Sequence, residues 1–121
     1  MDLDAVTLAQ LRSTLQHLLH DSDVEPGLSA EDAVQVTDEL VTNALRHGLP
    51  PRTCAVTLSH GPRLRVEVSD TSPEAPRFRA PDDTGGLGLV LVDQMSTAWG
   101  IDRHPGGKTV WAELTSSPDE H

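Results

Sequence analysis

Apolar residues recur at helical spacing in the first part of the chain. Four of them lie three or four positions apart: Leu8, Leu11, Leu15 and Leu18. Polar residues fill the positions between them, so the leucines would line one side of a helix. The pattern therefore predicts an amphipathic helix from Asp4 to His20.

A second helix is predicted after a loop rich in turn-forming residues. Ser29 and Asp32 form an S-x-x-D capping pattern, and the helix that starts there runs to about His47. Gly48 and Pro50 follow and end it. The apolar stripe of this helix consists of Ala33, Val36, Leu40, Val41 and Ala44.

Strands follow the second helix. Thr53–His60 and Arg63–Asp70 alternate apolar and polar residues around a tight reversal, which predicts a β-hairpin. A second predicted hairpin pairs Trp99–His104 with Lys108–Thr115. Between the hairpins, the sequence predicts a proline-containing loop over Thr71–Thr84 and then an apolar helix from Leu89 to about Ala98.

Composition limits the classes of function. A chain of 121 residues with 36% hydrophobic and 23% charged residues fits one compact domain, residues 1–121, with flexible ends expected at 1–3 and 116–121. Nineteen acidic residues against nine basic ones give a net charge of -10, which disfavours a nucleic acid partner. The single Cys54 and the lack of a long apolar run lead us to expect a cytoplasmic protein without a membrane span.

The second predicted helix carries a candidate site at the rim of its apolar stripe. Glu39 and Asn43 are one turn apart on the same side, and Arg46 and His47 project near that side. A Glu and an Asn at this spacing also fit a solvated surface pair. The helix alone therefore leaves both interpretations open.

Asp70 continues the alternation of Leu64, Val66 and Val68, so its carboxylate is expected on the apolar side of the strand. A charge there needs a partner. One interpretation is a carboxylate that accepts a hydrogen bond from an exocyclic amino group of a base. The alternative is a strand-end Asp that starts a turn with Thr71 and Ser72.

Glycines cluster where the long loop meets the third predicted helix. They lie in the sequence Gly85-Gly86-Leu87-Gly88. Glycines let the backbone approach a ligand, and the free N–H groups of a helix N-terminus favour phosphate. The cluster is a candidate phosphate-binding turn, although such a pattern alone is weak.

Together these segments resemble a known superfamily. Glu39–Gly48, Val68–Ser72 and Thr84–Leu89 are similar, in this order, to the N, G1 and G2 boxes of the GHKL ATPases, and Gly107–Trp111 is similar to their final-strand motif. The resemblance covers Ser29 to about Leu114. It implies a Bergerat-type α/β (α+β) two-layer sandwich, with helices on one face of a mixed, mostly antiparallel sheet.

The resemblance also implies ATP and Mg²⁺ as cofactors. Asn43 matches the magnesium ligand, Asp70 the reader of the adenine amino group, Glu39 the general base, and Arg46 a basic position that contacts phosphate. Gly86 and Gly88 would hinge a lid over the phosphates. The further nucleotide-binding positions implied are His47, Ser72, Gly85, Leu87 and Thr109.

Three features depart from the family pattern. Ser72 stands where a glycine is usual, and Lys108 stands where a threonine usually follows the glycine, with Thr109 next. The sequence also starts almost at the first helix, where relatives commonly begin with a strand.

Within the superfamily, the short chain and compact lid look most like the bacterial anti-sigma-factor serine/threonine kinases. That resemblance implies phosphoryl transfer from Mg-ATP to a protein such as an anti-anti-sigma factor, binding of a sigma factor, and a homodimer as an open alternative to a monomer. Two other functions stay open. One is a nucleotide-responsive protein-binding module with little turnover, and the other is an orphan histidine-kinase-like ATPase domain.

Overall fold

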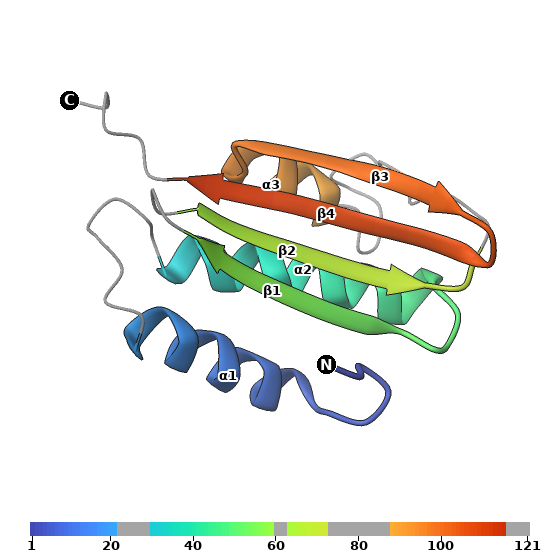
Figure 1. The fold of residues 1–121 in the computed structure, drawn as a ribbon, viewed down its shortest axis with the longest axis horizontal. Coiled ribbons are helices and arrows are strands. Elements are labelled where there is room, and N and C mark those ends of the chain that lie inside the picture. The colour runs from blue at the N-terminus through green and yellow to red at the C-terminus, as the bar shows by residue number, and fades with distance from the viewer. Residues whose placement is uncertain (22–29, 60–62, 73–87, 116–121) are drawn as a thin grey trace.

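The protein folds as a two-layer α+β sandwich (Figure 1). The computed structural model describes residues 1–21, 30–59, 63–72 and 88–115. Its elements are, in order, α1 (Leu8–Asp21), α2 (Ala30–His47), β1 (Thr53–Ser59), β2 (Arg63–Asp70), α3 (Gly88–Met95), β3 (Ala98–His104) and β4 (Gly107–Thr115). This architecture confirms the predicted fold class.

The four strands form one sheet in the order β1-β2-β4-β3. Both predicted hairpins are present, because β1 pairs with β2 and β3 pairs with β4, each antiparallel. The central pairing joins β2 to β4, also antiparallel, with Asp70 opposite Lys108. The end of β2 and the turn between β3 and β4 therefore lie at the same end of the sheet.

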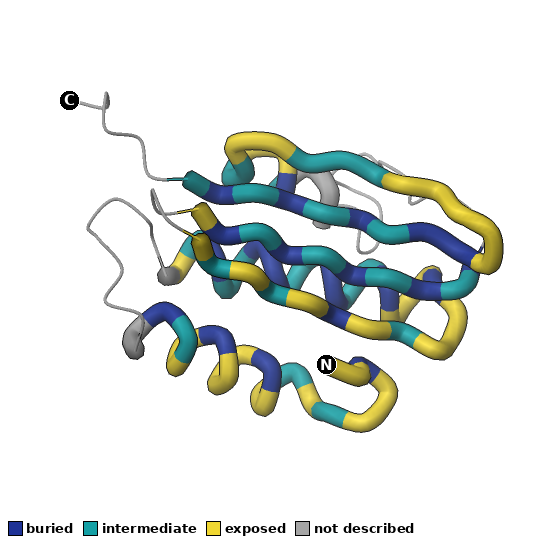
Figure 2. The backbone as a smooth tube through the Cα atoms, in the orientation of Figure 1, coloured by how far each residue is buried: buried dark blue, intermediate teal, exposed yellow. Residues whose placement is uncertain are grey.

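The core lies between one face of the sheet and the helices (Figure 2). The predicted apolar stripe of α2 is buried, and so is the predicted apolar face of β2. The strands contribute the following buried residues: Cys54, Leu64, Val66, Val68, Val110, Ala112 and Leu114. The alternation along β2 and β4 thus places every second residue against the helices.

Helix α1 begins later than its leucine spacing predicts. Thr7 and Gln10 form reciprocal hydrogen bonds: Gln10 N donates to Thr7 Oγ1 at 3.1 Å, and Thr7 N donates to Gln10 Oε1 at 2.8 Å. This capping box starts the helix at Leu8 and not at Asp4. Within the helix, Leu11, Leu15 and Leu19 are buried, so Leu19 takes the core position expected of Leu18.

The N-terminal residues pair with β1. Leu3 N donates to Arg52 O at 2.9 Å, Cys54 N donates to Met1 O at 2.8 Å, and Asp2 forms an antiparallel bridge with Thr53. Asp4 then accepts from Arg52 Nη1 at 2.6 Å. Residues 1–3, where we expected a flexible end and no strand, thus form a short paired segment along β1.

Helix α3 ends at Met95, three residues before the predicted end. Thr97 N donates to Glu113 O at 2.8 Å, and Ala98 pairs with Glu113. Thr97 and Ala98 therefore bond to β4 and do not continue the helix. None of the helices in the described part of the chain is long and apolar enough to cross a membrane.

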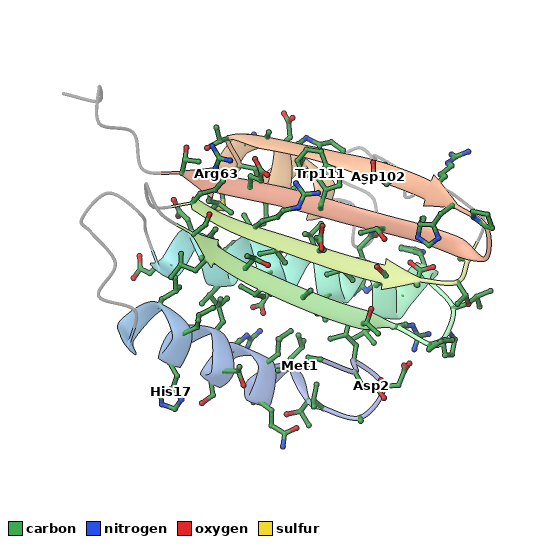
Figure 3. All side chains as sticks on the ribbon, in the orientation of Figure 1. Met1, Asp2, His17, Arg63, Asp102 and Trp111 are labelled. Carbon is green, nitrogen blue, oxygen red and sulfur yellow. The ribbon has the colours of Figure 1, made fainter. Side chains whose placement is uncertain are left out.

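The face of the sheet away from the helices carries polar and aromatic side chains (Figure 3). The guanidinium carbon of Arg65 lies 4.4 Å from the centroid of the Trp111 ring, within the range of a cation–π contact. Arg65 also pairs with Glu113, at 2.8 Å. Gly100 lies beneath the ring, since a Cβ there would meet Trp111 Cζ2 at 2.7 Å.

Candidate functional site

Helix α2 presents a polar strip beside its buried stripe. Gln35, Glu39 and Asn43 lie four residues apart and are each half-buried. Gln35 Nε2 donates to Glu39 Oε2 at 2.6 Å, which holds the Glu39 carboxylate along the helix. Arg46, on the same side, and His47 are exposed in the last turn. The rim position predicted for Glu39 and Asn43 is therefore the observed one.

Asp70 is the last residue of β2. Its side chain is only 2% exposed, as the parity of β2 predicts. Oδ1 accepts from Ser72 N at 2.7 Å, so Asp70 also starts the turn that was the alternative interpretation. The turn interpretation is thus confirmed, and the burial leaves the carboxylate on the side where the predicted contact with a base would lie.

Lys108 provides the partner that a buried carboxylate needs. Its Nζ donates to Asp70 Oδ1 at 3.0 Å, and its side chain is only 5% exposed. The two residues face each other in the β2–β4 register. Removal of either charge would leave the other buried without a counterion, which is strongly destabilising.

Close backbone contacts hold Asp70 against α2 and β4. A Cβ at Gly48 would come within 2.7 Å of Asp70 Oδ2, and a Cβ at Gly107 would collide with the carbonyl oxygen of Asp70. Leu49 N lies 3.5 Å from Oδ1, and Thr71 N donates to Leu49 O at 3.0 Å. The end of α2, the end of β2 and the start of β4 therefore meet around this carboxylate.

Ser72 takes part through its backbone. It is buried, and its N–H is the donor to Asp70 Oδ1. A serine in place of the usual glycine does not prevent this turn, because the backbone N–H makes the contact.

Thr109 lies on the other face of the sheet from Asp70. Its Oγ1 is 2.8 Å from Ser69 Oγ and 3.2 Å from His104 Nε2. Successive residues of a strand point to opposite faces, so Lys108 and not Thr109 faces the helices. The structure thus does not bring the Thr109 hydroxyl to the other predicted site residues.

The predicted glycine turn falls mostly outside the described residues. Gly85, Gly86 and Leu87 belong to the segment that the structure does not describe, and Gly88 is the first residue of α3. Their predicted contacts with phosphate therefore stay predictions.

Comparison with protein families gives a match over almost the whole chain. Residues 1–114 match the histidine kinase-like ATPase domain. The chain belongs to this family. Membership of this ATPase family implies that the domain binds ATP, and it agrees with the GHKL resemblance of the three sequence boxes.

Solved structures share the fold of this histidine kinase-like ATPase domain. A histidine kinase domain from the Erythrobacter litoralis EL346 blue-light activated histidine kinase has a TM-score of 0.57 at 20% identity, over 96% of this chain and 62% of that chain. Full-length ShkA in complex with AMPPNP has a TM-score of 0.56 at 24% identity, over 93% of this chain and 31% of that chain. At these identities the likeness is one of fold, and the chain spans less than two thirds of each of these proteins.

The side chains of the ATPase domain fit the groups that Mg-ATP presents. Asp70 offers a buried acceptor for an amino group, Asn43 offers an oxygen ligand of the kind that Mg²⁺ takes alongside substrate phosphates, and Glu39 offers a carboxylate that can accept a proton. Arg46, exposed at the end of the same polar strip, offers a cation for phosphate. The donor set is therefore consistent with the nucleotide and its metal ion.

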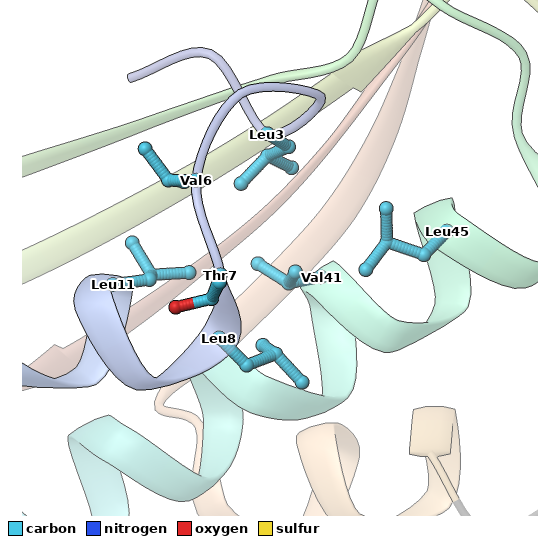
Figure 4. Close-up of a pocket in the computed structure, with 7 residues that line it drawn as sticks. All are labelled: Leu3, Val6, Thr7, Leu8, Leu11, Val41 and Leu45. Carbon is cyan, nitrogen blue, oxygen red and sulfur yellow. The ribbon is translucent and has the colours of Figure 1, made fainter.

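A small apolar pocket lies elsewhere in the domain, between the N-terminal segment, α1 and α2 (Figure 4). Its lining residues are Leu3, Val6, Thr7, Leu8, Leu11, Val41 and Leu45. Its volume of about 10 Å³ leaves room for at most one water molecule and none for a nucleotide. We assign this pocket to imperfect packing of α1.

Sequence reasoning missed two residues around Asp70. Gly48 was expected only to end α2, yet it contacts the carboxylate. Lys108 was noted as a departure from the family pattern but not as the partner of Asp70. A signal for Lys108 was present, because it continues the parity of Val110 and Ala112 on the buried face of β4.

Proposed function

We propose that this domain is an ATP-binding regulatory serine/threonine kinase of the anti-sigma-factor type. It transfers the γ-phosphoryl group of Mg-ATP to a protein such as an anti-anti-sigma factor, and it binds a sigma factor. In this proposal Asn43 holds Mg²⁺, Asp70 binds the adenine amino group, Glu39 is the general base and Arg46 contacts phosphate.

The observation that carries the proposal is the meeting of α2 with the end of β2. Gly48, just after α2, packs on Asp70. Asn43 lies five residues earlier, about 7.5 Å along the helix axis. A nucleotide whose base contacts Asp70 therefore has its phosphates on the side of the Asn43 and Glu39 strip.

Phosphoryl transfer needs few further groups from the protein. Phosphoryl transfer depends mainly on positioning and on neutralisation of charge, which a magnesium ion and backbone N–H groups supply. Glu39 would accept the proton of the substrate hydroxyl as the oxygen attacks the γ-phosphorus. Its hydrogen bond to Gln35 gives the carboxylate a defined orientation before substrate binds.

The choice of an anti-sigma-type kinase rests on the resemblance of the sequence boxes. The short chain of 121 residues and the expected compact lid between β2 and α3, residues 71–87, look most like that branch. The partner protein, the sigma factor and dimer formation all belong to the proposal.

Calorimetry tests the binding step. Titration of Mg-ATP, ATP with EDTA, Mg-ADP and Mg-GTP into the protein should show affinity for adenine nucleotides that magnesium increases. Asn43→Ala should remove the magnesium-dependent part of the affinity and leave the magnesium-free part. Absence of any affinity for adenine nucleotides would overturn the proposal.

A transfer assay tests the kinase step. Radiolabelled ATP and a candidate anti-anti-sigma protein should give a labelled partner with the wild type, and Glu39→Ala should lower the rate on the order of 10²-fold. Glu31→Ala is the matched control, because Glu31 is exposed in the first turn of the same helix. Equal rates for Glu39→Ala and the wild type would remove Glu39 from the mechanism.

One observation favours a second candidate function, a nucleotide-responsive binding module with little turnover. Lys108 already engages the carboxylate that would bind the base. Such a module would bind nucleotide and show a higher melting temperature with it, yet give no labelled partner in the transfer assay.

A further inference from the structure

We propose that Lys108 is a specificity-determining residue of the base site, because its ammonium competes with the exocyclic amino group of adenine for the carboxylate of Asp70. The inference rests on the proposed use of Asp70 to bind the base. It gives a role to the lysine that stands where the family pattern has a threonine.

Donors of the protein already occupy one oxygen of the Asp70 carboxylate. Oδ1 accepts from Ser72 N at 2.7 Å and from Lys108 Nζ at 3.0 Å, with Leu49 N at 3.5 Å. A carboxylate oxygen offers about two lone-pair sites. Oδ1 is therefore fully used before any ligand arrives.

The second oxygen is hemmed in on one side. A Cβ at Gly48 would lie only 2.7 Å from Oδ2, so the end of α2 packs against this oxygen. An amino group that approaches Asp70 thus has to share a crowded carboxylate with the Lys108 ammonium. The amino group at Oδ2 and the ammonium at Oδ1 would be two donors on one small carboxylate, and the repulsion between them favours displacement of Lys108.

The position of Lys108 allows its ammonium group to move away from the Asp70 carboxylate. It is the second residue of β4, next to the turn at Pro105 and Gly106, and both of these residues are exposed. A four-carbon side chain at this strand end can move its ammonium from the buried pair into solvent. The pair therefore acts against the ligand without blocking it permanently.

The ammonium also changes which base is preferred. Adenine presents an amino group where guanine presents a carbonyl oxygen. A carboxylate alone favours adenine and rejects guanine, whereas Lys108 can donate to the guanine oxygen. Lys108 thus lowers the affinity for adenine nucleotides and narrows the preference for them over guanine nucleotides.

The test is calorimetry of Mg-ATP and Mg-GTP with the wild type, Lys108→Thr and Lys108→Met. We expect Lys108→Thr to bind Mg-ATP about ten- to a hundredfold more tightly than the wild type, with no such gain for Mg-GTP. Arg103→Thr is the matched control, since Arg103 is exposed and lies opposite Lys108 in the β3–β4 register. It removes one positive charge from the same end of the sheet and should leave both affinities unchanged.

The outcomes separate this inference from the proposed function. If the wild type shows magnesium-linked affinity for ATP and neither Lys108 variant binds more tightly, the inference fails and the proposed function stands. If neither the wild type nor any variant binds an adenine nucleotide, the inference and the proposed function both fail. An equal gain for Arg103→Thr would assign the effect to net charge and would also overturn the inference.

A measurement on the wild type covers the case in which the Lys108 variants do not fold. Lys108 is the only lysine in the chain, so a protein labelled with ¹⁵N-lysine gives a single side-chain ammonium signal. Titration with Mg-ATP should shift this signal toward that of a solvated lysine as the pair opens. An unchanged signal at saturation, with backbone amide signals shifted, would show that nucleotide binds without displacing Lys108.

Discussion

The backbone of Gly48 packs on the carboxylate of Asp70, and a Cβ atom at position 48 would come within 2.6 Å of Asp70 Cγ. The same Cβ would lie 2.7 Å from the carbonyl oxygen of Ala44, so it has no room on either side. The end of α2 and the end of β2 thus touch at position 48, where only a residue without a Cβ atom fits. Any side chain at position 48 must move the carboxylate.

Gly48→Ala should destabilise the fold and weaken nucleotide binding. Overpacking of this kind costs about 1–3 kcal/mol of the free energy of unfolding, measured with denaturant. Gly106→Ala is the control: its Cβ meets nothing within 4 Å, and its φ of +87° costs about 1 kcal/mol in an alanine. We expect a lower affinity for Mg-ATP only in Gly48→Ala, and equal affinities in the two variants would contradict the role of this contact.

The buried ion pair makes a second prediction about stability. Asp70→Asn removes the counterion of the Lys108 ammonium, which costs about 3–5 kcal/mol while the ammonium stays buried and less once it moves into solvent. The double variant Asp70→Asn, Lys108→Met also removes the ammonium and should recover part of this loss. Denaturant unfolding of the wild type, both single variants and the double variant gives the coupling free energy. Strictly additive effects would mean that the two charges do not stabilise each other.

Cys54 should react slowly while the protein is folded. Burial raises the pKa of its thiol from the ordinary 9.0 to about 11. The thiolate is the reactive form, so at about pH 8 Ellman's reagent should react about a hundredfold more slowly than with the urea-unfolded protein. A folded protein that reacts at the unfolded rate would contradict the burial of Cys54.

The same thiol affects stability at high pH. Its pKa is higher in the folded state, so the folded protein holds the proton more tightly than the unfolded one. The contribution to stability is therefore complete below pH 9 and is lost as the pH rises toward about 11. Cys54→Ala should show a smaller decrease in the free energy of unfolding across this range.

The capping box of α1 gives the fifth prediction. Thr7→Ala removes the side-chain acceptor for Gln10 N and should cost about 1 kcal/mol of the free energy of unfolding. Thr14→Ala serves as the control, because the hydroxyl of Thr14 donates only to Gln10 O within the helix and is exposed. A larger loss in Thr14→Ala than in Thr7→Ala would contradict the assigned helix start.

The sequence predicts the local elements well, because each has a pattern of its own. The alternation of Leu64, Val66 and Val68 gives β2 its bounds, its buried face and the inward position of Asp70. The apolar stripe of α2 likewise predicts its buried side. These properties depend on neighbouring residues, so they can be derived before the fold is known.

The partners of the candidate site could not be derived in this way. The contact between Asp70 and Lys108 requires β4 to lie beside β2, and strand order depends on the whole chain. The same pairing directs the Thr109 hydroxyl away from the helices. The start of α1 was missed for a different reason, since the leucine spacing outweighed the capping pattern at Thr7.

The position of β4 has a consequence for how the protein folds during synthesis. Of the strands that the structure describes, β4 is the last to be synthesised, yet it is a central one, between β2 and β3. Until residues 107–115 emerge, β2 has only β1 beside it and β3 has no strand to pair with. The nascent chain is thus expected to stay unfolded until residues 107–115 have emerged, and then to close its sheet in one late step.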